Sequence, residues 1–206
     1  MICQLYLVIF IYFMYDRDEV KIMNNDIFLD ILKQVENISD LKSDDIPSLD
    51  LYMDQIMTLF DINLADNKRH EDDKLLTKTM INNYSKEGIL KPIKGKKYTK
   101  DHILQMVLIY FLKNTISIQE IKKVLQPYHD ETEKIEPIYN SFLEQKKQLT
   151  SHLSQEINGF IKKNNIDLSN SDQFTSVLLL MCCLSNQFKT IAEKMLDTYY
   201  QEENND

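Results

Sequence analysis

Lysines cluster in one stretch of an otherwise acidic chain. The segment 74–100 holds eight lysines and a single acid, Glu87, which gives it a local charge of +7. Because the whole chain of 206 residues carries −8, the remaining residues carry −15. Ammonium groups gathered in this way can neutralise phosphates, and the asymmetry indicates a basic contact surface on an acidic body. A solvated lysine-rich loop is the alternative interpretation.

Histidine and glycine, on which many active sites depend, give no pattern that indicates catalysis. The four histidines are scattered, and the run HEDD at 70–73 lacks the second histidine of a zinc-binding helix. With three glycines in the chain, a phosphate-cradling glycine loop is not expected. We therefore predict no enzyme activity, no metal site and no cofactor.

The number and spacing of the cysteines indicate the cellular compartment of the protein and the environment of two of the thiols. Cys3 and the adjacent pair Cys182 and Cys183 form neither a disulfide framework nor a metal knuckle, which favours a reducing, cytoplasmic setting. The pair lies in the apolar run VLLLMCCL, so we expect both thiols to be small buried hydrophobes.

The basic stretch lies within a pattern of helices, in a chain with few glycines and prolines. Apolar residues three and four apart predict a helix over 77–88 with a polar outward face. Gly88 is placed to end it in the left-handed conformation, and Pro92 prevents its continuation. The next run, KPIKGKKY at 91–98, has room only for a tight basic hairpin. Thr99 can cap the long helix that follows.

Further helices are predicted on both sides of this stretch. Ser117 and Glu120 form a capping box before a short helix. Upstream, amphipathic patterns cover 24–39 and 49–60, the second with Ser48 or Asp50 as its cap. Downstream, the last of several helices covers about 173–200. Its run VLLLMCCL is apolar all round and must be buried, inside a bundle or against a second subunit.

Residues 2–15, ICQLYLVIFIYFMY, are nearly all apolar and precede the charged run DRDE. A helix of that length covers about 21 Å of a hydrocarbon core of about 30 Å, and the segment lacks the flanking features of a signal peptide. We favour a true start at Met23, which would leave residues 1–22 without function. A short membrane anchor and a core element remain alternatives.

Residues 75–125 resemble the MerR-type winged-helix family. In that family the recognition helix ends in an aromatic, a basic residue, Glu-Gly and two aliphatics, followed shortly by proline. The matching residues here are Tyr84, Lys86, Glu87, Gly88, Ile89, Leu90 and Pro92. A wing motif and a later family motif are similar to Gly95 and Tyr98, and to Ser117, Ile118, Glu120 and Ile121. With IPSLDLYMDQIMTLFD upstream, the arrangement is similar to domain-of-unknown-function family 1836 of low-GC Gram-positive bacteria, which is thought to include transcription regulators.

The resemblance implies a transcription regulator, a repressor, that reads duplex DNA with the helix at 77–88 and the basic wing at 91–98. Lysines would contact phosphates, while Asn82, Asn83 and Ser85 face base edges. The implied contact residues are Lys78, Asn82, Asn83, Ser85, Lys86, Lys91, Lys94, Lys96, Lys97 and Tyr98. Asn82 and Asn83 depart from the family, which often has a basic residue and an aromatic there, but asparagine can read adenine. For Tyr98, core packing is an equal alternative. An adaptor that binds an acidic partner is the alternative function.

Taken together, these patterns predict an all-α protein in three parts. Residues 1–22 are an apolar extension, and residues 23–126 hold the N-terminal helices and a MerR-like winged helix-turn-helix with a small basic β-hairpin wing. Residues 127–206 form a C-terminal helical bundle for dimerisation or effector binding. The expected partners are double-stranded DNA and a second copy in a homodimer. An unknown effector is left open, as is a membrane if residues 2–15 act as an anchor.

Overall fold

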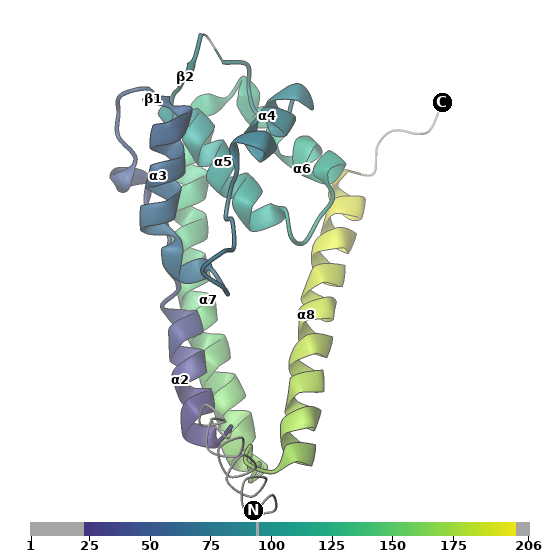
Figure 1. Cartoon of the computed structure of the whole chain (residues 1–206). Helices are drawn as coiled ribbons and strands as arrows, with labels where there is room; N and C mark the ends of the chain where they lie inside the picture. Colours follow the sequence, from purple (N-terminus) through teal and green to yellow (C-terminus); the bar gives the residue numbers. More distant parts are fainter. Residues whose placement is uncertain (1–22, 94, 201–206) are drawn as a thin grey trace, which may run out of the picture.

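The computed structural model describes residues 23–93 and 95–200, so the apolar segment 2–15, Cys3 and Lys94 lie outside it (Figure 1). Within these ranges the protein is mostly helical, as expected from its composition. The helices are α2 (Asn25–Glu36), α3 (Met53–Asn63), α4 (Lys78–Lys86), α5 (Lys100–Leu112), α6 (Ile118–Leu125), α7 (Ile135–Lys163) and α8 (Ser171–Tyr199). The strands are β1 (Leu51–Tyr52) and β2 (Lys97–Tyr98).

Local signals in the sequence set several helix ends. Thr99 directly precedes α5, and Ser117 and Glu120 form the capping box of α6, with the Ser117 N–H donating to the Glu120 carboxylate at 2.6 Å. At the end of α4, Gly88 has φ +66°, and its N–H donates to the Ser85 carbonyl at 3.2 Å. These three predictions are confirmed, because each depends only on residues within one turn.

The two strands come from segments far apart in the chain. Leu51 pairs with Tyr98 and Tyr52 with Lys97, in antiparallel register. The expectation of a small basic β-hairpin within 91–98 is therefore wrong, since the partner of β2 is β1. Burial of Leu51 and Tyr98 explains the pairing, because both side chains enter the core and bring the strands together. Because Leu51 and Tyr52 form β1, α3 begins only after Tyr52 and not at the expected caps Ser48 or Asp50.

The main hydrophobic core lies between α3, α4, α5, α6 and the first half of α7. α5 runs through its middle, with Ile103, Leu104 and Ile109 fully buried. From α7, Tyr139 is also fully buried and donates its hydroxyl to the Leu41 carbonyl at 2.6 Å. Burial and the nearby Asp40 carboxylate raise the pKa of Tyr139, which keeps the hydroxyl a donor. The core therefore continues past residue 126.

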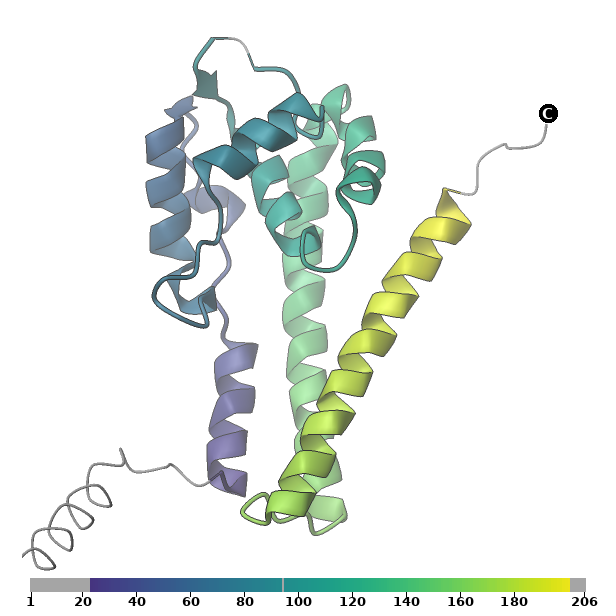
Figure 2. The same ribbon diagram turned by 45° about the vertical axis from the view of Figure 1, so that its right-hand side comes forward.

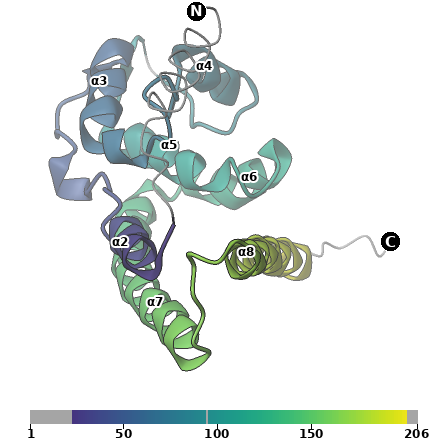
Figure 3. The ribbon, with the colours of Figure 1, turned by 60° about the horizontal axis from the view of Figure 1, so that its bottom comes forward.

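α8 is the least covered of the helices that the structure describes. It leaves the turn after α7 and runs back at an angle, apart from α2 and α7 (Figure 3). Of its residues only Val177 is buried, in a small cluster with Ile161 and Leu168, and both Cys182 and Cys183 are exposed. The expected burial of the two thiols is thus wrong for a single chain. Within the described ranges, α8 is also the one helix whose length and composition would allow a membrane crossing.

Candidate nucleic-acid interface

α4 lies at one end of the molecule, near the loop that leads to β2 (Figures 1 and 2). Ile81 and Tyr84 anchor the helix in the core, and burial raises the pKa of Tyr84. The side chains of Asn82 and Lys86 are exposed, as predicted from the helical spacing, and that of Asn83 is exposed too. Ser85 is half-buried, and its hydroxyl donates to the Ile81 carbonyl at 3.0 Å. The C-terminal half of α4 thus exposes two amides and a lysine, and its first turn exposes Lys78 and Thr79.

Two lysines among the expected phosphate contacts are engaged in ion pairs. Lys78 pairs with Asp54 at the start of α3, and the Lys91 Nζ lies 2.8 Å from the Asp101 carboxylate. The Lys91 side chain is only 17% exposed. Because each carboxylate offsets the charge of its partner, these lysines add little to the positive potential of the surface. Lys91 instead fixes the start of the loop to α5.

Three other expected contacts, Lys86, Lys96 and Lys97, are exposed and have no ion pair among the described residues. The Lys97 Nζ lies 5.0 Å from the centre of the Tyr52 ring, a cation–π contact that leaves its charge uncompensated. Of the expected contacts in the described part of the chain, these three lysines keep an uncompensated positive charge. Lys94, from the same loop, lies outside the described residues.

Tyr98, the last expected contact, faces the core. Its side chain is 4% exposed, and burial raises the pKa of its hydroxyl. The ring meets the His102 imidazole edge to face, with 5.8 Å between the ring centres. Two roles were expected for Tyr98, a DNA contact and core packing. Its buried position is the one that core packing requires. Tyr98 therefore holds the end of the loop.

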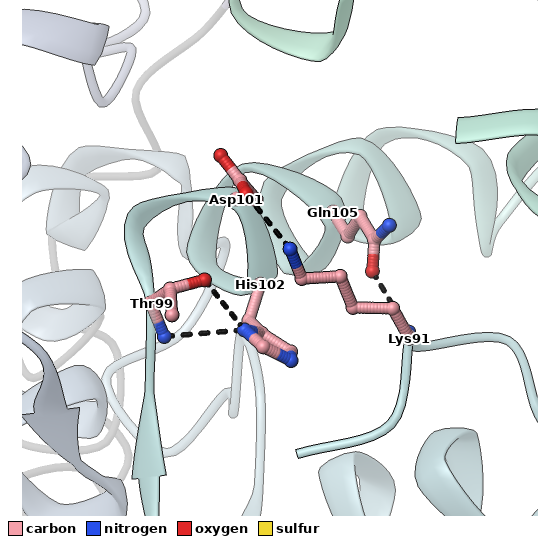
Figure 4. A network of polar contacts seen from close by, with 5 residues as sticks. All are labelled: Lys91, Thr99, Asp101, His102 and Gln105. Carbon is pink, nitrogen blue, oxygen red and sulfur yellow. Dashed lines mark hydrogen bonds and ion pairs between the residues drawn. The ribbon is translucent and has the colours of Figure 1, made fainter. Parts of the chain in front are cut away.

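A polar network on the first turns of α5 anchors both ends of this loop (Figure 4). At one end, the Lys91 N–H donates to the Gln105 Oε1 at 3.0 Å. At the other, the Thr99 N–H donates to the His102 Nδ1 at 3.1 Å, with the Thr99 hydroxyl 2.7 Å from the same nitrogen. His102 and Gln105 are both buried. The network therefore sets the paths of residues 91–93 and 95–99 over the protein surface.

His102 and Gln105 are site residues that the sequence analysis missed. His102 occupies the third position of α5, where a capping box usually carries glutamate or glutamine. The spacing Thr-x-x-His was therefore a signal of a capping box, but histidine is unusual at its last position and the pattern was not recognised. Because Nδ1 accepts the Thr99 N–H, the ring is held neutral with its proton on Nε2. Burial and the positive charge of Lys91 lower the pKa of His102.

This lowered pKa predicts a pH dependence of stability. Above the ordinary histidine pKa of about 6.5, the ring is neutral in both folded and unfolded chains. Below it, the unfolded chain binds a proton that the folded chain excludes, so the free energy of unfolding falls as the pH decreases. We expect urea denaturation between about pH 7 and pH 5 to show this loss in the wild type, with a smaller loss in His102→Gln, whose amide oxygen accepts the Thr99 N–H without titrating. Equal losses in both proteins would contradict this role for His102.

The fold and this surface define the class of protein. It is a mostly helical protein in which exposed lysines and amides lie beside a two-stranded sheet. Residues 41–142, about half of the chain, match the family model described as Domain of unknown function (DUF1836), which supports assignment of the protein to that family. The match starts at Leu41 and ends just after Tyr139, the two residues joined by the buried hydrogen bond. Searches of curated proteins and of solved structures gave no match.

Proposed function

We propose that the protein is a DNA-binding transcription regulator, a repressor of the MerR-like winged-helix type, that acts in the cytoplasm. The observation that carries this proposal is the grouping of Asn82, Asn83 and Lys86 with the loop lysines at one exposed end. α4 has nine residues and is about 13 Å long. The diameter of an α-helix with its side chains, about 10–12 Å, fits the major groove, which is about 12 Å wide. The core contacts of α4 would hold it rigid against the duplex.

In this proposal the exposed lysines and the exposed amides have different roles in DNA recognition. Lys86, Lys96 and Lys97 contact phosphates and position the protein, whereas Asn82 and Asn83 read base edges, with adenine as the expected partner. Each neutralised phosphate contributes about −0.9 to the slope of log affinity against log salt. Three lysines therefore predict a slope of about −2.7 per chain. Two chains acting together would read two half-sites.

The proposal is tested with the full chain and a duplex taken from the promoter of its own gene. Fluorescence anisotropy is measured over a salt series, with a shuffled duplex of equal length as competitor. We expect tighter binding to the promoter duplex and a salt-dependent affinity for both. Failure to bind any duplex at low salt would defeat the proposal. If the chain instead bound a polyglutamate peptide through the same lysines, the alternative of an adaptor for an acidic partner would be favoured.

Base readout by the amides has its own expected result. In the double variant Asn82→Ala, Asn83→Ala, affinity for the promoter duplex should fall by at least about 30-fold, since each of the two bidentate contacts that are lost is worth about 1–3 kcal/mol. Affinity for the shuffled duplex should stay unchanged in the same titration. As a contrast, Lys86→Ala should weaken binding to both duplexes equally, because a phosphate contact carries no sequence information. Equal losses on both duplexes in the amide variant would remove α4 as the reading element.

A further inference from the structure

Tyr52 and Lys97 lie opposite each other on the outer face of the small sheet, where they are partners in the antiparallel register. Successive side chains of a strand point to opposite faces, so the neighbouring pair, Leu51 and Tyr98, enters the core. Tyr52 is 52% exposed, and Lys97 is exposed as well. The contact between the Lys97 ammonium and the Tyr52 ring is therefore formed at the surface, within reach of a partner.

The main chain under both residues is fixed. The Tyr52 N–H donates to the Gln55 Oε1 at 2.9 Å, and α3 begins at the next residue. On the other strand, Lys97 is followed directly by the buried Tyr98. A tyrosine side chain has few rotatable bonds, whereas the lysine ammonium group is carried on a long flexible stem. The ring is thus a rigid support that restricts the position of a mobile cation.

Lys96 is the natural comparison for Lys97. It is the adjacent residue, carries the same charge and is also exposed. In the described part of the chain, the lysines that lie over aromatic rings are Lys97, Lys113 and Lys146, and Lys96 has neither such a contact nor an ion pair. Lys96 must therefore lose more conformational freedom than Lys97 when it binds an anion.

We propose that Tyr52 is a positioning residue for DNA that holds the Lys97 ammonium group in place for a phosphate, an inference that rests on the proposed function. The ammonium group has several N–H donors, and those directed away from the ring stay free for phosphate oxygens. Its charge is not compensated by the ring. A lysine ordered in this way binds a phosphate more tightly than a mobile one, because less conformational entropy is lost on association.

A purely structural role is the alternative for the same pair, since side chains directly opposite on antiparallel strands stabilise a sheet. In that case, loss of the Tyr52 ring would disturb the loop whether or not residue 97 carries a charge. If Tyr52 acts through Lys97, its loss affects DNA binding only while the lysine is present. A double-mutant cycle separates these two roles.

Fluorescence anisotropy of the full chain, with the promoter duplex and the shuffled duplex, provides the cycle. Tyr52→Ala should weaken binding to both duplexes by about 3- to 10-fold, the effect of having to order one long side chain on binding. The slope of log affinity against log salt should stay as in the wild type, because no charge is removed. Tyr52→Phe should bind as the wild type does, because it keeps the ring.

The charge-matched backgrounds carry the decision. Lys97→Met and Lys96→Met each remove one positive charge and should each reduce the steepness of the salt slope by about 0.9. In the Lys97→Met background, Tyr52→Ala should cause no further loss of affinity. In the Lys96→Met background, the same exchange should keep its full effect. Equal losses in the two backgrounds would overturn the positioning role in favour of a structural one.

A measurement without DNA separates this inference from the proposed function. In the free protein, with lysines labelled with carbon-13, the ring current of residue 52 should move the Lys97 Cε protons upfield in the wild type and in Tyr52→Phe, and not in Tyr52→Ala. Absence of this shift from the wild type would overturn the inference. If the wild type binds DNA, unchanged affinity in Tyr52→Ala would overturn the inference alone. A Tyr52→Phe as weak as Tyr52→Ala would also overturn it, in favour of direct contact by the hydroxyl. A wild type that binds no duplex would defeat the proposed function and this inference with it.

Discussion

Exchange of two neighbouring lysines for glutamate, Lys96→Glu and Lys97→Glu, should lower affinity for duplex DNA by about 1000-fold at low salt. The double exchange changes the charge beside the duplex by four units, and one unit near a phosphate is worth about 1 kcal/mol in water at 4 Å. Fluorescence anisotropy with the promoter duplex and the shuffled duplex measures the loss. Both affinities should fall, because phosphate contacts act on any sequence.

The fold should tolerate this exchange. Both side chains are exposed, and the cation–π interaction that the exchange removes, between Lys97 and the Tyr52 ring, is worth about 0.5–1 kcal/mol at an exposed site. The matched control is Lys162→Glu, Lys163→Glu, an adjacent exposed pair at the far end of α7 with the same change of charge. The control should bind DNA almost as the wild type does. If both variants lost affinity equally, net charge alone would explain binding and the loop would have no special role.

Replacement of Tyr139 by alanine should lower the free energy of unfolding by about 3–5 kcal/mol, because it empties a fully buried aromatic site. Tyr139→Phe keeps the ring and removes only the hydroxyl, which leaves the Leu41 carbonyl without its donor at a cost of about 1–3 kcal/mol. Urea denaturation followed by circular dichroism measures both changes. The series separates packing from hydrogen bonding at one position.

An exposed tyrosine gives the control for this series. Tyr199 near the end of α8 is 82% exposed, so Tyr199→Ala should change stability by less than about 0.5 kcal/mol. The result for Tyr139→Ala also bears on how the chain is organised. A small effect would mean that α7 folds apart from the helices at 53–125, in conflict with the shared core.

The sequence predicted those parts of the fold that depend on neighbouring residues. Helix α4, the left-handed Gly88 and the capping box of Ser117 and Glu120 are local, and all three are present. The pairing of Leu51 with Tyr98 joins residues 47 positions apart, and no local pattern specifies such a partner. The apolar run in α8 was expected to be buried, but periodicity indicates only that a surface needs cover and not which chain provides it.

The candidate site was predictable to a similar extent. Helical spacing placed Lys78, Asn82 and Lys86 on the exposed face of α4, where the structure has them, whereas Ser85, also expected there, is half-buried. The ion pair of Lys91 with Asp101 was not predictable, because the chain must first fold back along α5 to bring the two side chains together. The number of exposed cations at this surface is consequently smaller than the count of lysines suggests.

The anchored loop before β2 has a consequence for how this surface can change. Its two ends are fixed by hydrogen bonds, one from the Lys91 N–H to the side-chain Oε1 of Gln105 and others in the pairing of β2 with β1. At the tip, Gly95 and Lys96 are exposed, and a Cβ at residue 95 would meet no other atom within 4 Å, although its φ of +80° favours glycine. The tip residue Lys96 can therefore be exchanged at little cost to folding. Selection or design can retune the affinity of this surface while the scaffold beneath it stays the same.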